Sequence, residues 1–343
     1  MDHVKILKRA ANITWRYRAL WLFGILAAVF AGGGGGRGGG GGGNTGYSFG
    51  SGDVSRGFGG MLAPQDWARV VAGVIVVMLV ILAFVFVLSL VGVVLRYLSE
   101  TALIRMVNDH EETGVKRSVG YGFRLGWSRA TWRLFLIDLL IAIPTALVFV
   151  LLFLLALSTL LLWATGNETL GVMGTIATVG LIVLVVLLLL VVVAVLSLLR
   201  PFFWRVCALQ NKGVIESISQ GYAMVRRHLR DAGSMWLILI GVQIVWGLVM
   251  IPVMICLVLL GLLAGGLPAL LVGSLVGLVS QGAPAWLLGL AVGIPIFILV
   301  VAVPALFLEG LWLIFKSSVW TLTYRELRAL ENVQPTQPAP SEA

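Results

Sequence analysis

Two carboxyl groups lie inside long apolar stretches of the sequence, at Asp138 and Glu309. An aspartate at the centre of a membrane helix costs about 2.5–3.5 kcal/mol on insertion scales, so acids retained there are candidates for a proton or ion pathway. Gln243, in another apolar stretch, is a third candidate for an intramembrane polar site. Because Asp138 and Glu309 both lie within two turns of basic residues, a structural ion pair or a water contact is the alternative interpretation.

The other residues that could bind a metal or act as nucleophiles form no recognisable constellation. His3, His110 and His228 have no acid or cysteine at ligand spacing, and Cys207 and Cys256 fit neither a metal site nor a disulfide framework. There is no zincin, nucleophile-elbow or paired-aspartate motif. The sequence therefore predicts no catalytic residue, no metal site and no cofactor. An intramembrane enzyme built from distant segments is left as an alternative without a visible motif.

The glycine-rich segment 32–43, interrupted only by Arg37, matches a nucleotide-binding glycine pattern trivially. No Lys-Ser or Lys-Thr pair follows it, and no strand-to-helix context surrounds it. We interpret residues 32–66 as a flexible extracytoplasmic loop.

The composition decides which solvent the chain folds in. Of 343 residues, 59% are hydrophobic and 11% are charged, and the mean hydropathy is +1.03. A soluble domain carries about 25% charged residues, so this chain could not cover a surface that faces water. Lipid must be its main solvent, and the fold class we predict is an all-α polytopic membrane protein.

Six apolar stretches predict transmembrane helices, since about 20 apolar residues cross the hydrocarbon core. They run approximately over residues 15–31, 70–95, 134–163, 174–199, 235–264 and 286–315. The first stretch is short, and a cleaved signal peptide at 15–31 is an alternative that would leave five spans. Residues 269–279 are apolar but too short to span, which suggests a re-entrant or surface helix.

The basic residues orient these spans. The N-terminus up to Arg18 and the segments after the second, fourth and sixth spans hold 21 Lys and Arg, and the opposite side holds only Arg37, Arg56 and Arg69. The positive-inside rule then predicts a bacterial cytoplasmic membrane protein with both termini in the cytoplasm. The net charge of +9 does not indicate nucleic acid binding, because the basic residues flank apolar spans instead of forming one patch.

An internal repeat is visible in the basic segments. Gly114-Val115, Ser118-Val119 and Gly122-Phe123 recur 99 residues later as Gly213-Val214, Ser217-Ile218 and Gly221-Tyr222. The N-terminus is a weaker third copy. We predict one transmembrane domain, residues 1–330, made of repeats 1–112, 113–212 and 213–330, followed by a disordered cytoplasmic tail, 331–343. Each repeat would comprise a basic amphipathic interfacial helix and a transmembrane hairpin.

Apolar side chains recur at helical spacing in these basic segments, and the cations lie off the apolar stripes. The stripes are Val115, Val119, Phe123 and Trp127 in one copy and Val214, Ile218, Tyr222 and Val225 in the next. Such helices lie in the headgroup plane, with their basic side toward anionic lipid. The candidate lipid contacts are Lys116, Arg117, Arg124, Arg129, Arg226, Arg227 and Arg230. The alternative is a cytoplasmic cap that only satisfies the positive-inside bias.

This pattern resembles a family of uncharacterised bacterial six-helix membrane proteins and the membrane domain attached to some glycerophosphodiester phosphodiesterases. The likeness is carried by residues 15–21 (WRYRALW), 118–123 and 217–222, and would cover residues 1–330. It implies a membrane module near lipids, and it transfers no catalytic residue, because the chain has no soluble barrel. The leading hypothesis is a lipid-interacting or scaffolding membrane module. The alternatives are a transporter or channel using Asp138 and Glu309, and an intramembrane enzyme.

Overall fold

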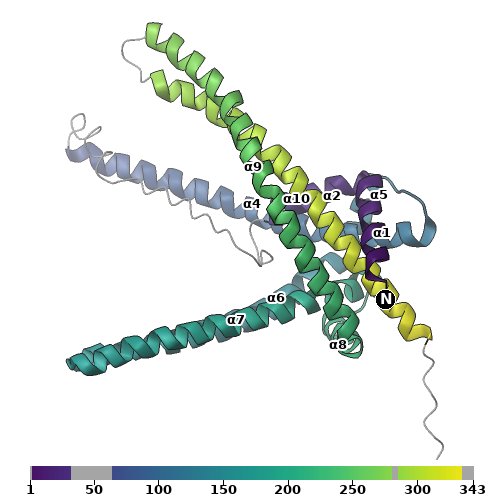
Figure 1. The fold of residues 1–343 in the computed structure, drawn as a ribbon. Coiled ribbons are helices and arrows are strands. Elements are labelled where there is room, and N and C mark those ends of the chain that lie inside the picture. The colour runs from purple at the N-terminus through teal and green to yellow at the C-terminus, as the bar shows by residue number, and fades with distance from the viewer. Residues whose placement is uncertain (1, 32–63, 280–284, 334–343) are drawn as a thin grey trace, which may run out of the picture. The chain divides into compact units, whose positions relative to one another are not determined.

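The computed structural model describes residues 2–31, 64–279 and 285–333, and all regular elements within these ranges are helices. They are α1 (His3–Arg16), α2 (Ala19–Ala31), α4 (Pro64–Thr113), α5 (Val119–Gly126), α6 (Arg129–Ser158), the 3-10 helix η1 (Thr159–Thr165), α7 (Glu168–Gln210), α8 (Val214–Arg227), α9 (Leu229–Val279) and α10 (Ala285–Val333) (Figure 1).

Five of these helices, α4, α6 with η1, α7, α9 and α10, are long and apolar enough to cross a membrane. The helices α1 and α2 count as a sixth only as a pair, which is bent by 96°. The prediction of an all-α polytopic membrane protein is therefore confirmed. The first span differs from expectation, because α2 has only 13 residues, or about 20 Å of helix, and begins after a bend at Tyr17 and Arg18.

Several helices run further than the apolar stretches that predicted them. The helices α4, α7 and α10 continue to Thr113, Gln210 and Val333, well past the expected ends at 95, 199 and 315. The interpretation of 269–279 as a separate re-entrant or surface helix is wrong, because α9 runs through it without a break. The first residues of the predicted tail, 331–333, belong to α10, because this helix continues beyond the end of its apolar stretch.

Two further expectations concern residues mostly outside the described ranges. The glycine-rich loop predicted at 32–66 lies outside them as far as residue 63, and α4 already begins at Pro64. The tail beyond Val333 also lies outside them.

The chain divides into two compact units, Phe30–Arg96 and the combination of Met1–Val29 with Tyr97–Ala343. In the first unit, large apolar side chains from Ile75 to Val91 of α4 are exposed. Gly92 lets the Phe30 ring pack closely against the α4 backbone, since a Cβ on Gly92 would lie 2.7 Å from that ring. Apolar exposure on this scale is what a lipid solvent permits and water does not.

The second unit contains two helical hairpins, α6–α7 and α9–α10, whose helices lie side by side (Figure 1). The α6–α7 turn is closed by η1 and by Gly166, which has φ +71°. In the other hairpin, a Cβ on Gly265 would lie 2.6 Å from the Gly293 carbonyl oxygen. The small residues therefore let the two backbones meet, as membrane helix pairs often do.

The core of the second unit lies at what we call the basic end: α1, α5, α8 and the adjoining ends of α4, α7 and α10. The helix α1 packs on α10, α8 packs on α7, and α5 meets α4, where Gly122 faces Met106. Ile6, Ala10 and Ile13 of α1 are buried in this core. The apolar face of α1 is thus covered by protein.

The apolar stripe predicted at Val115, Val119, Phe123 and Trp127 is only partly as expected. Residues 114–118 form a loop, in which Gly114 has φ +69°, so Val115 precedes the helix and is exposed. The stripe was therefore wrong at its start, because the left-handed Gly114 ends the α4 region and the loop 114–118 places Val115 outside α5. Trp127, just after the helix, is also exposed.

Candidate functional site

Asp138 of α6 is buried at the basic end and is the centre of a hydrogen-bond network. It accepts hydrogen bonds from Tyr97 Oη at 2.6 Å, Arg200 Nε at 2.6 Å and Trp204 Nε1 at 3.0 Å. Arg200 also forms an ion pair with it, and only 6% of the Asp138 side chain is exposed. The carboxylate is thus fully engaged by α4 and α7, which is the arrangement a buried charge requires.

The aromatic residues of this network hold its cation in place. The Arg200 guanidinium lies 4.9 Å from the centre of the Trp204 ring, one turn further along α7. The Tyr97 ring packs edge-on against Trp204 and Phe135. A planar guanidinium that is stacked and hydrogen-bonded in this way is preorganised for a carboxylate.

Sequence reasoning found Asp138 but not its partners. The nearer Arg133 donates instead to the carbonyl oxygens of Asn211 and Lys212, at 2.6 and 3.2 Å. A usable signal was present, because Tyr97 and Arg200 lie two residues and one residue beyond the ends of predicted spans and therefore near the depth of Asp138.

The other two candidates for an intramembrane polar site lie on different helices. Gln243 of α9 is exposed, and Glu309 of α10 is half-buried. Within the described residues, no hydrogen bond or ion pair joins Asp138, Gln243 and Glu309. Glu309 does interact electrostatically with the Lys316 ammonium, two turns along α10.

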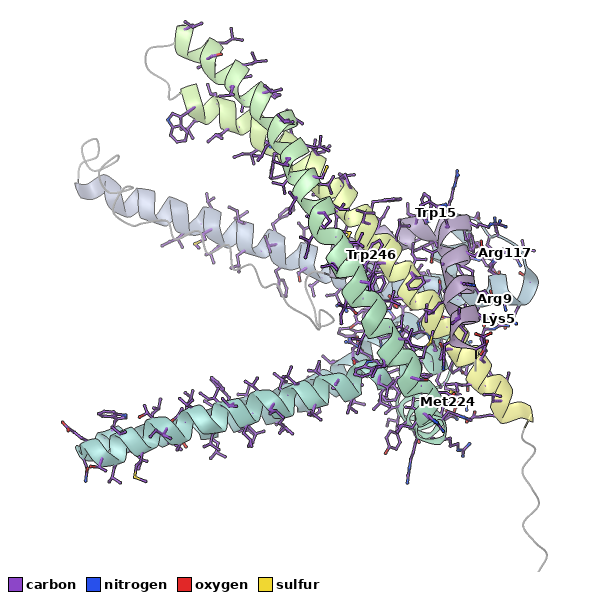
Figure 2. The ribbon with its side chains drawn as sticks, in the orientation of Figure 1. Lys5, Arg9, Trp15, Arg117, Met224 and Trp246 are labelled. Carbon is purple, nitrogen blue, oxygen red and sulfur yellow. The ribbon has the colours of Figure 1, made fainter. Side chains whose placement is uncertain are left out.

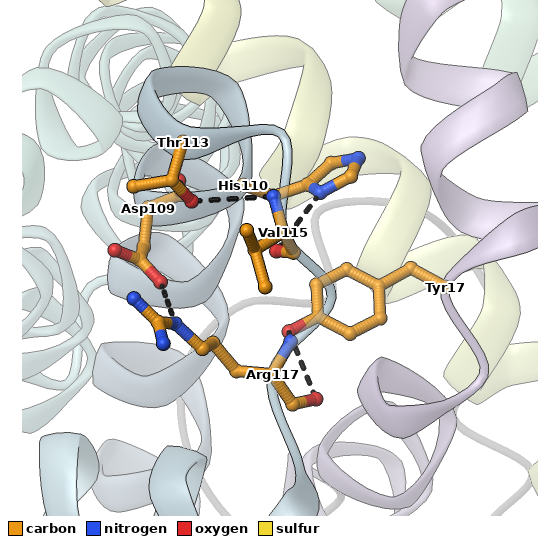
Figure 3. A network of polar contacts seen from close by, with 6 residues as sticks. All are labelled: Tyr17, Asp109, His110, Thr113, Val115 and Arg117. Atoms are coloured by element: carbon orange, nitrogen blue, oxygen red, sulfur yellow. Dashed lines mark hydrogen bonds and ion pairs between the residues drawn. The ribbon is translucent and has the colours of Figure 1, made fainter.

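The loop between α4 and α5 is held by a second polar network (Figure 3). The Tyr17 hydroxyl accepts a hydrogen bond from the Arg117 backbone N–H at 2.7 Å and donates to the Arg117 carbonyl at 3.1 Å. The Arg117 side chain pairs with Asp109 at 2.9 Å, and this hydrogen bond raises the pKa of the guanidinium. The His110 ring packs on Tyr17 and contacts the Val115 carbonyl.

The candidate lipid contacts divide into two groups. Some cations are paired with acids of the protein: Arg117 with Asp109, and Arg227 with Glu331 at 3.6 Å. In α1, Arg9 donates to Glu111 at 3.0 Å in the same way. The remaining cations are exposed: Lys116, Arg124, Arg129, Arg226 and Arg230. Arg124 rests on the Tyr121 ring, with 5.5 Å between its central carbon and the ring centre.

Arginines that sequence reasoning overlooked connect the three long helix ends. Arg105 of α4 donates to the Ala208 carbonyl of α7 at 2.9 Å, and Arg205 of α7 donates to the Ser317 carbonyl of α10 at 2.9 Å. Arg325 of α10 links that helix back to α4 by donating to Asn108 Oδ1 at 2.8 Å. These residues hold the ends of α4, α7 and α10 together.

No group of three metal-binding side chains occurs within the described residues. A fold with five or six membrane-length apolar helices and a polar, hydrogen-bonded basic end defines a multi-pass helical membrane protein. Residues 7–324 match the model of a family of unknown function, DUF7544, and the chain belongs to that family. No curated protein and no solved structure matches the chain.

Proposed function

We propose that this protein is a lipid-interacting membrane module whose basic end binds anionic phospholipid. The observation that carries the proposal is the contrast between its acids and its cations. Asp138, the buried acid, is already neutralised by Arg200, whereas several basic residues beside the apolar helices are exposed. Basic groups that flank membrane helices attract anionic headgroups, each contributing about 1 kcal/mol near the surface.

The exposed tryptophans support this placement. Trp15 and Trp127 are 71% and 75% exposed, beside the bends that follow α1 and α5 (Figure 2 labels Trp15). Tryptophan is enriched at membrane–water interfaces, because its ring is apolar and its N–H can remain hydrated. An exposed tryptophan next to an exposed arginine therefore suits the headgroup level.

The experiment is native mass spectrometry of the full chain released from nanodiscs of equal phosphatidylglycerol and phosphatidylcholine content. We expect the protein to retain phosphatidylglycerol preferentially, and less of it as the salt concentration rises. A variant with Gln at the exposed cations Lys116, Arg124, Arg129, Arg226 and Arg230 should lose most of the preference. Its matched control, with Lys for each Arg and Arg for Lys116, keeps the charge and should keep the preference. Equal retention of the two lipids by the wild-type protein would overturn the proposal.

We further propose that the basic end and both termini face the cytoplasm of a bacterial cell, as the positive-inside bias indicates. Cysteines introduced as Thr169→Cys, at the α6–α7 turn, and Ser219→Cys, on α8, test this in a Cys207→Ala, Cys256→Ala background. An impermeant thiol reagent should label the first position in intact spheroplasts and the second only after permeabilisation. The reverse pattern would invert the proposed topology.

A transporter or channel that uses Asp138 and Glu309 receives less support. Asp138 has three hydrogen-bonding partners, so a transported ion would have to displace Arg200. The half-buried Glu309 and its electrostatic partner Lys316 are the features that favour this alternative. Ion flux into liposomes that contain the protein, abolished by Glu309→Gln, would establish transport. For an intramembrane enzyme, the described residues bring together no group of three metal-binding side chains that would support it.

A further inference from the structure

Resting on the proposed function, we infer that the anionic lipid binds at three equivalent bends, one in each proposed repeat. Each bend joins an interfacial helix to the helix that follows it. They lie at Tyr17–Arg18 between α1 and α2, at Trp127–Ser128 between α5 and α6, and at His228 between α8 and α9. The ligand at each bend is the phosphate of one anionic phospholipid headgroup.

Some cations away from the bends are poorer sites, because they already have acidic partners. Each of the three interfacial segments carries one cation that is paired with an acid on a long helix. Arg9 pairs with Glu111 of α4, Arg117 with Asp109 of α4, and Arg227 with Glu331 of α10. A lipid phosphate would have to compete with a carboxylate at each of these positions.

The bends, in contrast, present cations that face solvent. Arg16 and Arg18 flank the first bend, Arg129 follows the second, and Arg226 and Arg230 flank the third. All five side chains belong to exposed residues and form no ion pair within the described residues. The charge needed to bind a phosphate is therefore free at all three bends.

An exposed apolar side chain lies within two residues of a cation at each bend and indicates the depth of the site. These side chains are Trp15, Trp127 and Leu229. The bend also sets the start of the following helix, so that Arg18, Arg129 and Arg230 lie at or beside the first residue of α2, α6 and α9. The backbone N–H groups of a first helical turn favour anions, which adds to the arginine charge.

The test counts the phosphatidylglycerol molecules retained by the full chain in native mass spectrometry from mixed nanodiscs. The wild-type protein should retain three. The variants Arg16→Gln/Arg18→Gln, Arg129→Gln and Arg226→Gln/Arg230→Gln should each retain one fewer. The matched control, Arg9→Gln/Arg227→Gln, also removes two charges but takes them from paired cations, and should retain all three.

Two outcomes of the lipid count would overturn the inference. One is a control variant that loses as many lipids as the double bend variants, which would mean that only total charge matters. The other is a full lipid count in all three bend variants, which would leave the proposed function standing but place its site elsewhere. Inorganic phosphate at millimolar concentration should not displace the lipid, because it lacks the acyl chains that lie beside Trp15 and Trp127. Displacement by it would identify a site for free phosphate instead.

Discussion

The two ends of helix α7 have opposite patterns of exposure. Leu184 and Leu190, in its apolar stretch, are each 64% exposed, whereas Phe202 and Val206, near its basic end, are fully buried. The same contrast holds along α6 and α9, whose side chains project outward along most of their length (Figure 2). One continuous helix therefore passes through two environments, and different forces hold it in each.

In the apolar stretches, exposure of leucine to lipid carries no penalty, so helix pairs there depend on close backbone approach. At the basic end apolar side chains are buried within the protein, and where such burial removes them from water it contributes about 25 cal/mol per Å². The buried polar groups of that end add directional contacts. We therefore expect substitutions at the basic end to affect folding more than similar substitutions in the apolar stretches.

The largest effect is expected from Asp138→Ala. Removing the carboxylate leaves Arg200 without its counter-ion, and breaking a buried ion pair typically costs about 3–5 kcal/mol. The measurement is the free energy of unfolding in mixed micelles with increasing denaturing detergent. Leu184→Ala on the exposed stretch of α7 is the control and should change it little. Equal losses for the two variants would contradict the contrast between the two ends.

A smaller effect is expected where α2 meets α10. A Cβ on Gly310 would lie 2.8 Å from the Ile25 backbone nitrogen, so Gly310→Ala should destabilise the protein by about 1–3 kcal/mol. Gly180→Ala in the apolar stretch of α7 is the matched control, because nothing lies within 4 Å of its Cβ position. It should be neutral or stabilising, since alanine is the better helix former by up to about 1 kcal/mol. Thermal unfolding followed by size-exclusion chromatography would compare the two.

Tyr17→Phe should cost about 1–2 kcal/mol, because it leaves the Arg117 backbone N–H without its partner. The effect should be local. Amide hydrogen exchange should increase over the loop 114–118 and much less elsewhere. Tyr222→Phe, on the exposed side of α8, changes the same group and should leave exchange unaltered. Faster exchange throughout the basic end would show that Tyr17 supports the whole core instead.

The smallest effect is expected from Arg9→Gln, which removes the ion pair with Glu111. The Arg9 side chain is largely exposed, and pairs of this kind contribute less than about 1 kcal/mol. The loss should disappear in high salt, because solvent-facing charges are screened. A loss that persists in 1 M salt would mean that packing of the arginine stem matters more than its charge.

The sequence by itself determined the solvent, the helical class and the positions of most long helices. These properties depend on composition and on runs of apolar residues, which are local quantities. It also singled out Asp138 as unusual, because a single acid in an apolar stretch is visible without any knowledge of its neighbours. The lengths of α4, α7 and α10 were underestimated, since their basic ends are helical for reasons of packing and not of hydropathy.

Only the tertiary structure decided which cation pairs with which acid. Arg200 is 62 residues from Asp138, and Arg9 is 102 residues from Glu111, so neither pair can be deduced from local spacing. The structure also decided that the apolar face of α1 packs on α10, whereas the amphipathic pattern alone predicted contact with lipid. An amphipathic helix needs an apolar surface to cover, and the sequence pattern is the same whether that surface is lipid or protein.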